Sequence, residues 1–222
     1  MKKKTIAVLL LCALFVVMTC GASAPSGTKT KVDYETALGV MGDDGYTNEY
    51  FGVGMELPEG WTFFSDEELA QMLDVTLKVI DDEKLTEMMT AALEDAGAVT
   101  NMAAKDKLGM KNVNMRLTKV EDKILLALSE EDILRYSIDT VKDMLESAGY
   151  EDLELEIGET EFAGENKSIL YITGKLYDLP VYQGEVLLMG EEYYAILTFT
   201  SVMDDALDEV IEPWYALEAE ED

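Results

Sequence analysis

Apolar residues recur along this chain at helical spacing in several segments, and each such segment predicts an amphipathic helix. Between residues 81 and 96 they fall three or four positions apart, which places them on one face of a helix. A longer helix is predicted from its N-cap residue Ser129 to Ala148, and Gly149 is expected to end it. The apolar stripe of this helix is Leu134, Ile138, Val141, Leu145 and Ala148.

Three further segments also carry helical signals. The run Ser65-Asp66-Glu67-Glu68 has the spacing of a capping box, so a helix is predicted to begin at Ser65. A short helix is predicted within residues 32–41. A last helix is predicted from about Asp204, where Pro213 is expected to kink it or to force its final turn apart. The apolar face of this last helix is Leu207, Val210, Ile211 and Trp214.

Elsewhere apolar and polar residues alternate, which predicts β-strands. The first strand is expected at 53–57, and two more near 99–105 and 112–120. In the strand at 112–120, one face is apolar and the other is expected to face solvent, as in a half-exposed antiparallel strand. The apolar face carries Val113, Met115 and Leu117, and the polar face Asn112, Asn114, Arg116 and Thr118. Four consecutive strands with short turns follow at 153–162, 168–177, 179–189 and 192–201.

The order of these elements predicts the fold class. Strands occur in groups, with helices set between the groups, which is typical of α+β proteins. We therefore predict an antiparallel β-sheet with helices packed on it. We assign a single α+β globular domain to residues 46–217 and an acidic tail to 218–222. About 170 residues are enough to bury a core of substantial size.

The N-terminus has the layout of a signal peptide, which we assign to residues 1–19. Lys2, Lys3 and Lys4 precede a 13-residue apolar run, Ile6 to Met18. As a helix this run spans roughly 20 Å, which is short of the hydrocarbon core of a membrane at about 30 Å. Its length therefore suits the apolar region of a signal peptide better than a membrane span.

Two processing routes follow this apolar run. The residues Val17-Met18-Thr19-Cys20 resemble a bacterial lipobox, which implies cleavage before Cys20 and a diacylglyceryl thioether on that cysteine. Residues 20–45 are then the lipidated cysteine and a flexible tether. The alternatives are an ordinary cleavage site at Ala22-Ser23-Ala24, which predicts a secreted protein, and an uncleaved anchor. On the lipobox interpretation the protein lies on the outer face of the cell membrane.

Charge and composition exclude several classes of function. The chain has 17 basic and 46 acidic residues, and losing the leader changes its net charge from −29 to −32. Nucleic acid and anionic membrane surfaces repel such a chain, so we expect no nucleic-acid partner. Without histidine, no Ser-His-Asp triad or His-ligated metal site can form. Both cysteines, Cys12 and Cys20, belong to the leader region, so the domain is expected to hold no disulfide and no Cys metal site. We assign it no catalytic residue, metal or cofactor.

Two groups of side chains remain as candidates for a binding site. Four acidic residues of the 153–162 strand could form an edge that holds calcium through oxygen ligands, although a solvated strand face explains them equally: Glu154, Glu156, Glu159 and Glu161. Tyrosines are concentrated on the C-terminal strands, where they either pack in the core or face a sugar or protein ligand. The candidate ligand-facing residues are Tyr171, Tyr177, Tyr182 and Tyr193.

Several short motifs resemble those of small extracytoplasmic lipoproteins of Gram-positive gut anaerobes. The motifs are Phe51-Gly52 followed by Leu57-Pro58-Glu59-Gly60-Trp61, then Ser65-Asp66-Glu67-Glu68-Leu69, Asn112-Val113-Asn114, Leu145-Glu146-Ser147-Ala148-Gly149-Tyr150, Phe162-Ala163-Gly164 and Trp214-Tyr215-Ala216-Leu217. Such proteins are similar to the PsbP-like αβα sandwich group. The resemblance implies a binding or assembly role rather than a reaction.

These observations together predict a function class without naming a ligand. We expect an exported, lipid-anchored protein that acts as a non-catalytic binding or assembly module at the cell surface. Its partners are then the membrane, through Cys20, and a surface protein or small ligand. A carboxylate-based hydrolase with paired acids and a calcium-dependent surface module are the alternatives.

Overall fold

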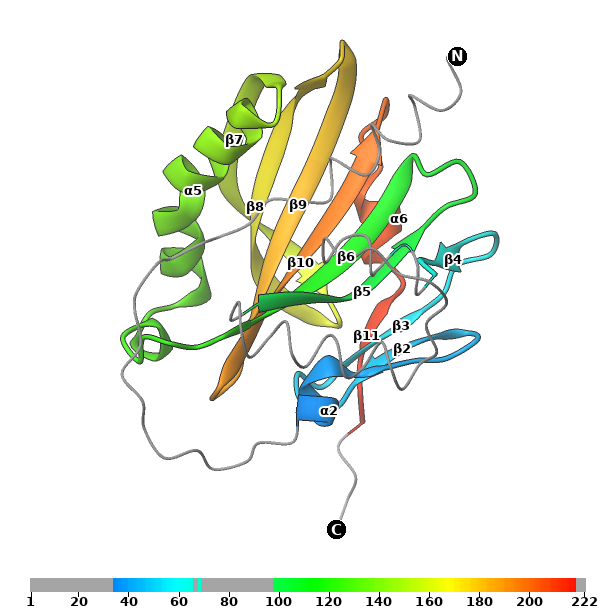
Figure 1. Cartoon of the computed structure of the whole chain (residues 1–222), viewed down its shortest axis with the longest axis vertical. Helices are drawn as coiled ribbons and strands as arrows, with labels where there is room; N and C mark the ends of the chain where they lie inside the picture. Colours follow the sequence, from blue (N-terminus) through cyan, green and yellow to red (C-terminus); the bar gives the residue numbers. More distant parts are fainter. Residues whose placement is uncertain (1–33, 66–67, 69–97, 219–222) are drawn as a thin grey trace.

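A computed structural model describes residues 34–65, 68 and 98–218, which form two antiparallel sheets and a few helices (Figure 1). The larger sheet has seven strands in the order β4-β5-β6-β10-β9-β8-β7. Along the chain these are β4 (Thr62–Phe63), β5 (Ala98–Lys105), β6 (Lys111–Lys119), β7 (Tyr150–Phe162), β8 (Glu165–Leu176), β9 (Leu179–Met189) and β10 (Tyr193–Val202). This architecture agrees with the α+β class predicted from the sequence.

The smaller sheet combines the start and the end of the described chain. Its order is β1-β2-β3-β11, with β1 (Val40–Met41), β2 (Gly45–Asn48), β3 (Val53–Glu56) and β11 (Trp214–Ala216). Strand β11 pairs antiparallel with β3, so that Trp214 lies opposite Met55. Hydrogen bonds from Glu56 N to Pro213 O (3.1 Å) and from Leu217 N to Gly52 O (2.9 Å) extend this pairing at both ends.

The larger sheet packs apolar side chains on both faces. On one face, side chains of β8, β9 and β10 pack against helix α5 (Glu130–Ser147), as Leu170, Leu187 and Ile196 do. On the other face, the sheet packs against α6 (Leu207–Ile211) and the smaller sheet, in a core that includes Phe199 and Trp214. Figure 1 shows α5 lying along β7 and β8, with β2, β3 and β11 near the opposite corner of the large sheet.

Helix α5 has the ends predicted from the sequence. The Ser129 hydroxyl accepts a hydrogen bond from Asp132 N at 3.1 Å, as an N-cap residue does. The helix stops before Gly149, which has a φ of 92°, a conformation that glycine adopts without strain. Ala148 was placed on the buried stripe but is exposed, whereas Ile133 and Ser137 are buried.

Some of the other predicted elements are confirmed, and some lie outside the described residues. The four C-terminal strands and both strands between residues 98 and 120 are confirmed, each within a few residues of its expected ends. The capping box is also present, because Ser65 N donates to a Glu68 carboxylate oxygen (2.8 Å) and Glu68 N donates to Ser65 Oγ (3.3 Å). The remainder of that helix and the helix expected at 81–96 lie outside the described residues, as do the leader and Cys20.

The prediction for the last helix is wrong beyond Ile211. Helix α6 ends there, and Trp214, which was expected on its apolar face, lies in strand β11. Pro213 explains the change because it has no N–H to continue the helical hydrogen bonds. The chain instead turns into the smaller sheet, where the Trp214 side chain is buried.

Part of the range expected to be a flexible tether is folded. Helix α2 (Tyr34–Leu38) and strand β1 lie within it, and Ala37 and Leu38 are buried. The Leu38 carbonyl accepts hydrogen bonds from the Tyr46 hydroxyl (3.0 Å) and from Asn101 Nδ2 (2.8 Å). These contacts fix α2 to β2 and β5, so the folded part of the chain begins by residue 34.

The polar face of strand β6 is less exposed to solvent than the sequence predicts. Asn112 and Asn114 are 2% and 3% exposed, and the intervening Val113 is buried on the opposite face. Strict alternation of polar and apolar residues predicts a half-exposed strand, and Arg116 and Thr118 are partly exposed, but the Asn112 and Asn114 end of the polar face is covered. Among the described helices, none is long and apolar enough to cross a membrane.

Candidate functional site

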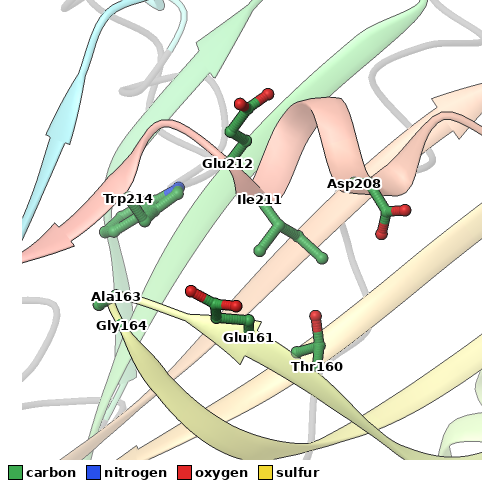
Figure 2. A pocket seen from close by; sticks show the side chains of 8 residues that line it. All are labelled: Thr160, Glu161, Ala163, Gly164, Asp208, Ile211, Glu212 and Trp214. Atoms are coloured by element: carbon green, nitrogen blue, oxygen red, sulfur yellow. The ribbon is translucent and has the colours of Figure 1, made fainter.

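A pocket of about 360 Å³ lies between the β7–β8 turn and helix α6 (Figure 2). Its volume falls in the range of sites that hold small molecules. The lining residues come from two stretches of chain about fifty residues apart: Thr160, Glu161, Ala163, Gly164, Asp208, Ile211, Glu212 and Trp214.

The sheet topology and one tight turn build this pocket. The hairpin between β7 and β8 turns through Ala163 and Gly164, which have φ values of 51° and 77°. Strand β7 ends at Phe162, one residue after Glu161, and Phe162 packs in the same core as the α6 residues Leu207, Val210 and Ile211. Helix α6 then supplies Asp208, and the chain leaving it supplies Trp214.

Aromatic packing holds the Trp214 wall of the pocket in place. Trp214 is 5% exposed. The distance between ring centroids is 5.5 Å to Phe162 and 6.3 Å to both Phe199 and Tyr46. The indole Nε1–H group is buried and has no hydrogen-bond partner in the described part of the chain. A buried donor without an acceptor costs free energy.

The pocket has a negative electrostatic character. Three acidic side chains line it, Glu161, Asp208 and Glu212, and no basic residue does. Within the described residues none of the three is in an ion pair, whereas the neighbouring Glu209 pairs with Lys111 at 2.6 Å. A cleft lined by charges of one sign concentrates their field.

Tyr171, one of the predicted ligand-facing tyrosines, lies within reach of this field. Burial is the main cause that raises the pKa of its hydroxyl, and the negative charges of Asp208, Asp205 and Glu156 raise it further. A hydrogen bond with Thr160 acts in the opposite direction.

The four predicted tyrosines occupy different parts of the fold. Tyr171 and Tyr182 are partly buried and pack against the core that contains Trp214. Tyr177 is 63% exposed in the β8–β9 turn, where it has a φ of 52°, and Tyr193 is 1% exposed at the start of β10. The structure therefore places Tyr171 and Tyr182 on the face of the sheet that packs against α6 and the smaller sheet, buries Tyr193 and leaves Tyr177 exposed in a turn. A ligand contact at any of them stays a prediction.

The acidic residues proposed as a calcium edge are divided between the faces of β7. Its pairing with β8 is continuous from Glu154 to Phe162. Because side chains alternate between the two faces of a strand, Glu154 and Glu156 lie on one face and Glu159 lies on the opposite face. In the described ranges no group of three or more Asp, Glu, His or Cys side chains is arranged to hold a metal ion.

Sequence analysis missed a second cluster, which we call the buried polar patch: Asn112, Asn114, Gln183, Glu185, Thr198 and Thr200. Each is at most 7% exposed, and they lie side by side on β6, β9 and β10, on the face of the sheet that α5 packs against. Both carboxylate oxygens of Glu185, Asn112 Oδ1 and Asn114 Nδ2 have no partner in the described part of the chain. Burial raises the pKa of Glu185 to about 7. Only the unusual Gln183 and Glu185 within an otherwise apolar strand hinted at this patch.

Comparison with known proteins yields distant structural likenesses only. No family model and no curated protein matches the chain. A crystal structure from Bacteroides thetaiotaomicron superposes with a TM-score of 0.38 at 11% identity, covering 77% of this chain and 47% of that one. The chain therefore spans about half the length of that protein. LpqN of Mycobacterium tuberculosis, described as involved in cell envelope biogenesis, gives a TM-score of 0.38 at 8% identity, covering 75% of this chain and 83% of LpqN.

Proposed function

We propose that this chain is an exported, lipid-anchored binding module of the cell surface, and that the acidic pocket between β7 and α6 is its ligand site. The observation that carries the proposal is the pocket itself. It has the volume of a small-molecule site, a rigid aromatic wall and three acidic side chains in its lining. The lipobox-like residues before Cys20 support a location at the outer face of the cell membrane. The resemblance to extracytoplasmic lipoproteins of the PsbP-like group supports a binding role.

Binding is favoured over hydrolysis because of where the perturbed carboxyl group lies. A glycosidase-like mechanism needs one carboxylic acid with a raised pKa beside a second carboxylate. Glu185 is the carboxyl group with a raised pKa, but it is 1% exposed and is not part of the pocket lining. The three acids that line the pocket keep hydrolysis as the second candidate. A release of reducing sugar from cell-wall glycans that is lost in E161Q and D208N would favour it.

The membrane address is tested by the mass of the mature N-terminal peptide from the producing cells. A diacylglyceryl group on Cys20 supports anchoring, because two acyl chains hold a protein stably at a membrane. An unmodified peptide that begins beyond Cys20 contradicts it and indicates secretion. The calcium-dependent alternative predicts a higher melting temperature in millimolar calcium, and a constant melting temperature counts against it.

The pocket is tested without knowing the ligand. A small-molecule extract of the producing cells is added to the protein, and the melting temperature is measured. The proposal predicts that the extract raises the melting temperature of the wild type. Thr160→Trp places a bulky ring in the pocket and should abolish this increase, whereas Glu154→Trp, on the same strand outside the pocket, should retain it. An increase that survives Thr160→Trp places the ligand elsewhere.

A further inference from the structure

Strand β7 is the last strand of the seven-stranded sheet, and it is long for a strand at an edge (Figure 1). It has 13 residues, whereas a typical strand has about 5–6. Proteins commonly protect a sheet edge by keeping its strand short or by a bulge. Strand β4 at the opposite edge has 2 residues, but the bulge of β7 lies near its start, between Glu151 and Glu154. From Glu154 to Phe162 the pairing with β8 is regular.

The outer edge of β7 presents backbone groups that have no strand beside them. The β7–β8 turn has two residues at positive φ, so the pair next to it, Phe162 and Glu165, exchanges backbone hydrogen bonds. Bonded pairs alternate along an antiparallel ladder, so the residues between them direct their N–H and C=O groups away from β8. These residues are Leu155, Ile157, Glu159 and Glu161. The Tyr171 hydroxyl donates to Glu159 O at 3.3 Å, but no backbone group in the described part of the chain pairs with this edge.

Acidic side chains flank this edge on both faces of the strand. They are Glu154, Glu156, Glu159 and Glu161. All four are exposed, and within the described residues none of them is in an ion pair. The two lysines of β8, Lys167 and Lys175, do not compensate these charges because they pair with other acids. The edge therefore combines unpaired backbone groups with uncompensated negative charge.

We infer that the outer edge of β7 binds an extended, basic segment of a partner protein, which joins the sheet as a further strand. Backbone hydrogen bonds to the unpaired edge hold the segment, as in other cases of β-strand addition. Its lysine or arginine side chains lie beside the glutamates of β7, and opposite charges on neighbouring strands stabilise the pairing. The inference goes beyond the proposed function, because it concerns a second surface and needs no ligand in the pocket.

The same charges disfavour a second copy of this chain as the occupant of the edge. Two β7 strands paired with each other would bring the glutamates of both copies side by side. Like charges opposite each other destabilise a strand pair. The occupant is therefore a segment of opposite charge, and because the glutamates are exposed, its binding should weaken as salt is added.

Three synthetic peptides test the inference on the unmodified protein. The first, acetyl-Lys-Val-Lys-Val-Lys-Val-Lys-amide, is basic and favours an extended strand. The second has glutamate in place of each lysine, which reverses the charge. The third has proline in place of the central valine, which keeps the charge but interrupts the backbone pairing. In calorimetric titrations we expect the first peptide to bind with a Kd below about 1 mM, and the other two at least about tenfold more weakly.

Two substitutions at one position separate the backbone of the edge from its charge. Glu159→Pro removes the charge and an N–H that points away from β8, so the β7–β8 ladder keeps its hydrogen bonds. Glu159→Gln removes the charge alone. We expect Glu159→Gln to weaken binding of the basic peptide about two- to threefold, and Glu159→Pro at least about tenfold. Glu146→Gln, which replaces an exposed acid of α5, should leave the binding unchanged.

The outcomes separate strand addition from other kinds of binding. Equal binding of the basic and the proline peptide, or no binding of the basic peptide up to about 10 mM, overturns the inference. These two results need no substitution, so they decide the matter even if Glu159→Pro does not fold. Sedimentation of the wild type tests the second copy, and a dimer that Glu159→Pro dissociates also overturns the basic partner. The thermal test with Thr160→Trp is independent of all these results, so the pocket and the edge stand or fail separately.

Discussion

The buried carboxyl group of Glu185 gives the fold a distinctive dependence on pH. Glu185 is 1% exposed, and its oxygens have no hydrogen-bond partner in the described part of the chain. Because burial removes water from the charged form, its pKa rises from an ordinary 4.5 to about 7. Between these two values the folded protein holds a proton on Glu185 that the unfolded chain has released. The free energy of unfolding is therefore highest below the lower value and decreases as the pH rises through about 7.

The size of this effect follows from the difference between the two pKa values. Each unit corresponds to about 1.4 kcal/mol, so ionising Glu185 in the folded state costs about 3 kcal/mol. Glutamine has nearly the same shape as protonated glutamate and cannot ionise. At pH 5 we expect Glu185→Gln to match the wild type within about 1 kcal/mol, and at pH 8 to be more stable by about 3 kcal/mol.

Urea unfolding at pH 5, 6, 7 and 8 measures this difference directly. Taking wild type minus variant at each pH removes the contributions of the other titrating groups. Glu154→Gln, which replaces an exposed acid of β7, serves as the matched control and should show a difference that stays flat across the range. A flat difference for Glu185→Gln as well would refute the reasoning, because it would mean that Glu185 ionises in the folded protein as easily as in water.

Four further substitutions test the packing of the small sheet and the cap of α5, each by urea unfolding. Tyr46→Phe should lower the free energy of unfolding by about 1–3 kcal/mol, because two buried amides and a carbonyl lose the hydroxyl as partner; a neutral effect would contradict that hydrogen-bond network. Gly45→Ala should cost about 1–3 kcal/mol, since its Cβ would lie 2.3 Å from the backbone oxygen of Met55. Gly42→Ala meets nothing closer than 3.7 Å and should change stability by less than about 0.5 kcal/mol, so equal effects would argue against the close β2–β3 approach. Ser129→Ala should cost about 1 kcal/mol by removing the N-cap of α5, and an unchanged stability would mean that water replaces the cap.

Local patterns predicted the elements whose structure is decided locally. Helix α5 has an N-cap serine, an apolar stripe and a terminal glycine, and each signal acts within a turn or two of chain. The four C-terminal strands are joined by short turns, so their antiparallel pairing also follows from the sequence. The capping box at Ser65 belongs to the same class of short-range signals.

Distant contacts decided the parts that sequence analysis missed. Trp214 lies in a strand because β3, about 160 residues earlier, offers it an edge for pairing. Asn112 and Glu185 alternate with apolar neighbours as residues of a half-exposed strand do, and only the arrangement of the layers decides that both faces are covered. A polar position that is buried and one that is exposed give the same alternation.

The acidic pocket could not be predicted for a related reason. Its carboxylates stand about fifty residues apart in sequence, on β7 and on α6, and only the seven-stranded sheet brings these elements together. The sequence showed Glu161 as one member of an acidic strand and Asp208 as part of a helix. The pocket also depends on the early end of α6 at Ile211, before Pro213, after which the chain enters the smaller sheet at Trp214.

The measurement that tests the account most directly is the mass of the intact protein recovered from its cells without denaturation. Native mass spectrometry would compare the wild type with Thr160→Trp, which fills the pocket, and with Glu154→Trp, which does not. We predict a bound component on the wild type and on Glu154→Trp that is absent from Thr160→Trp. A wild-type protein without any bound component, or a component that Thr160→Trp retains, would contradict the pocket as the ligand site.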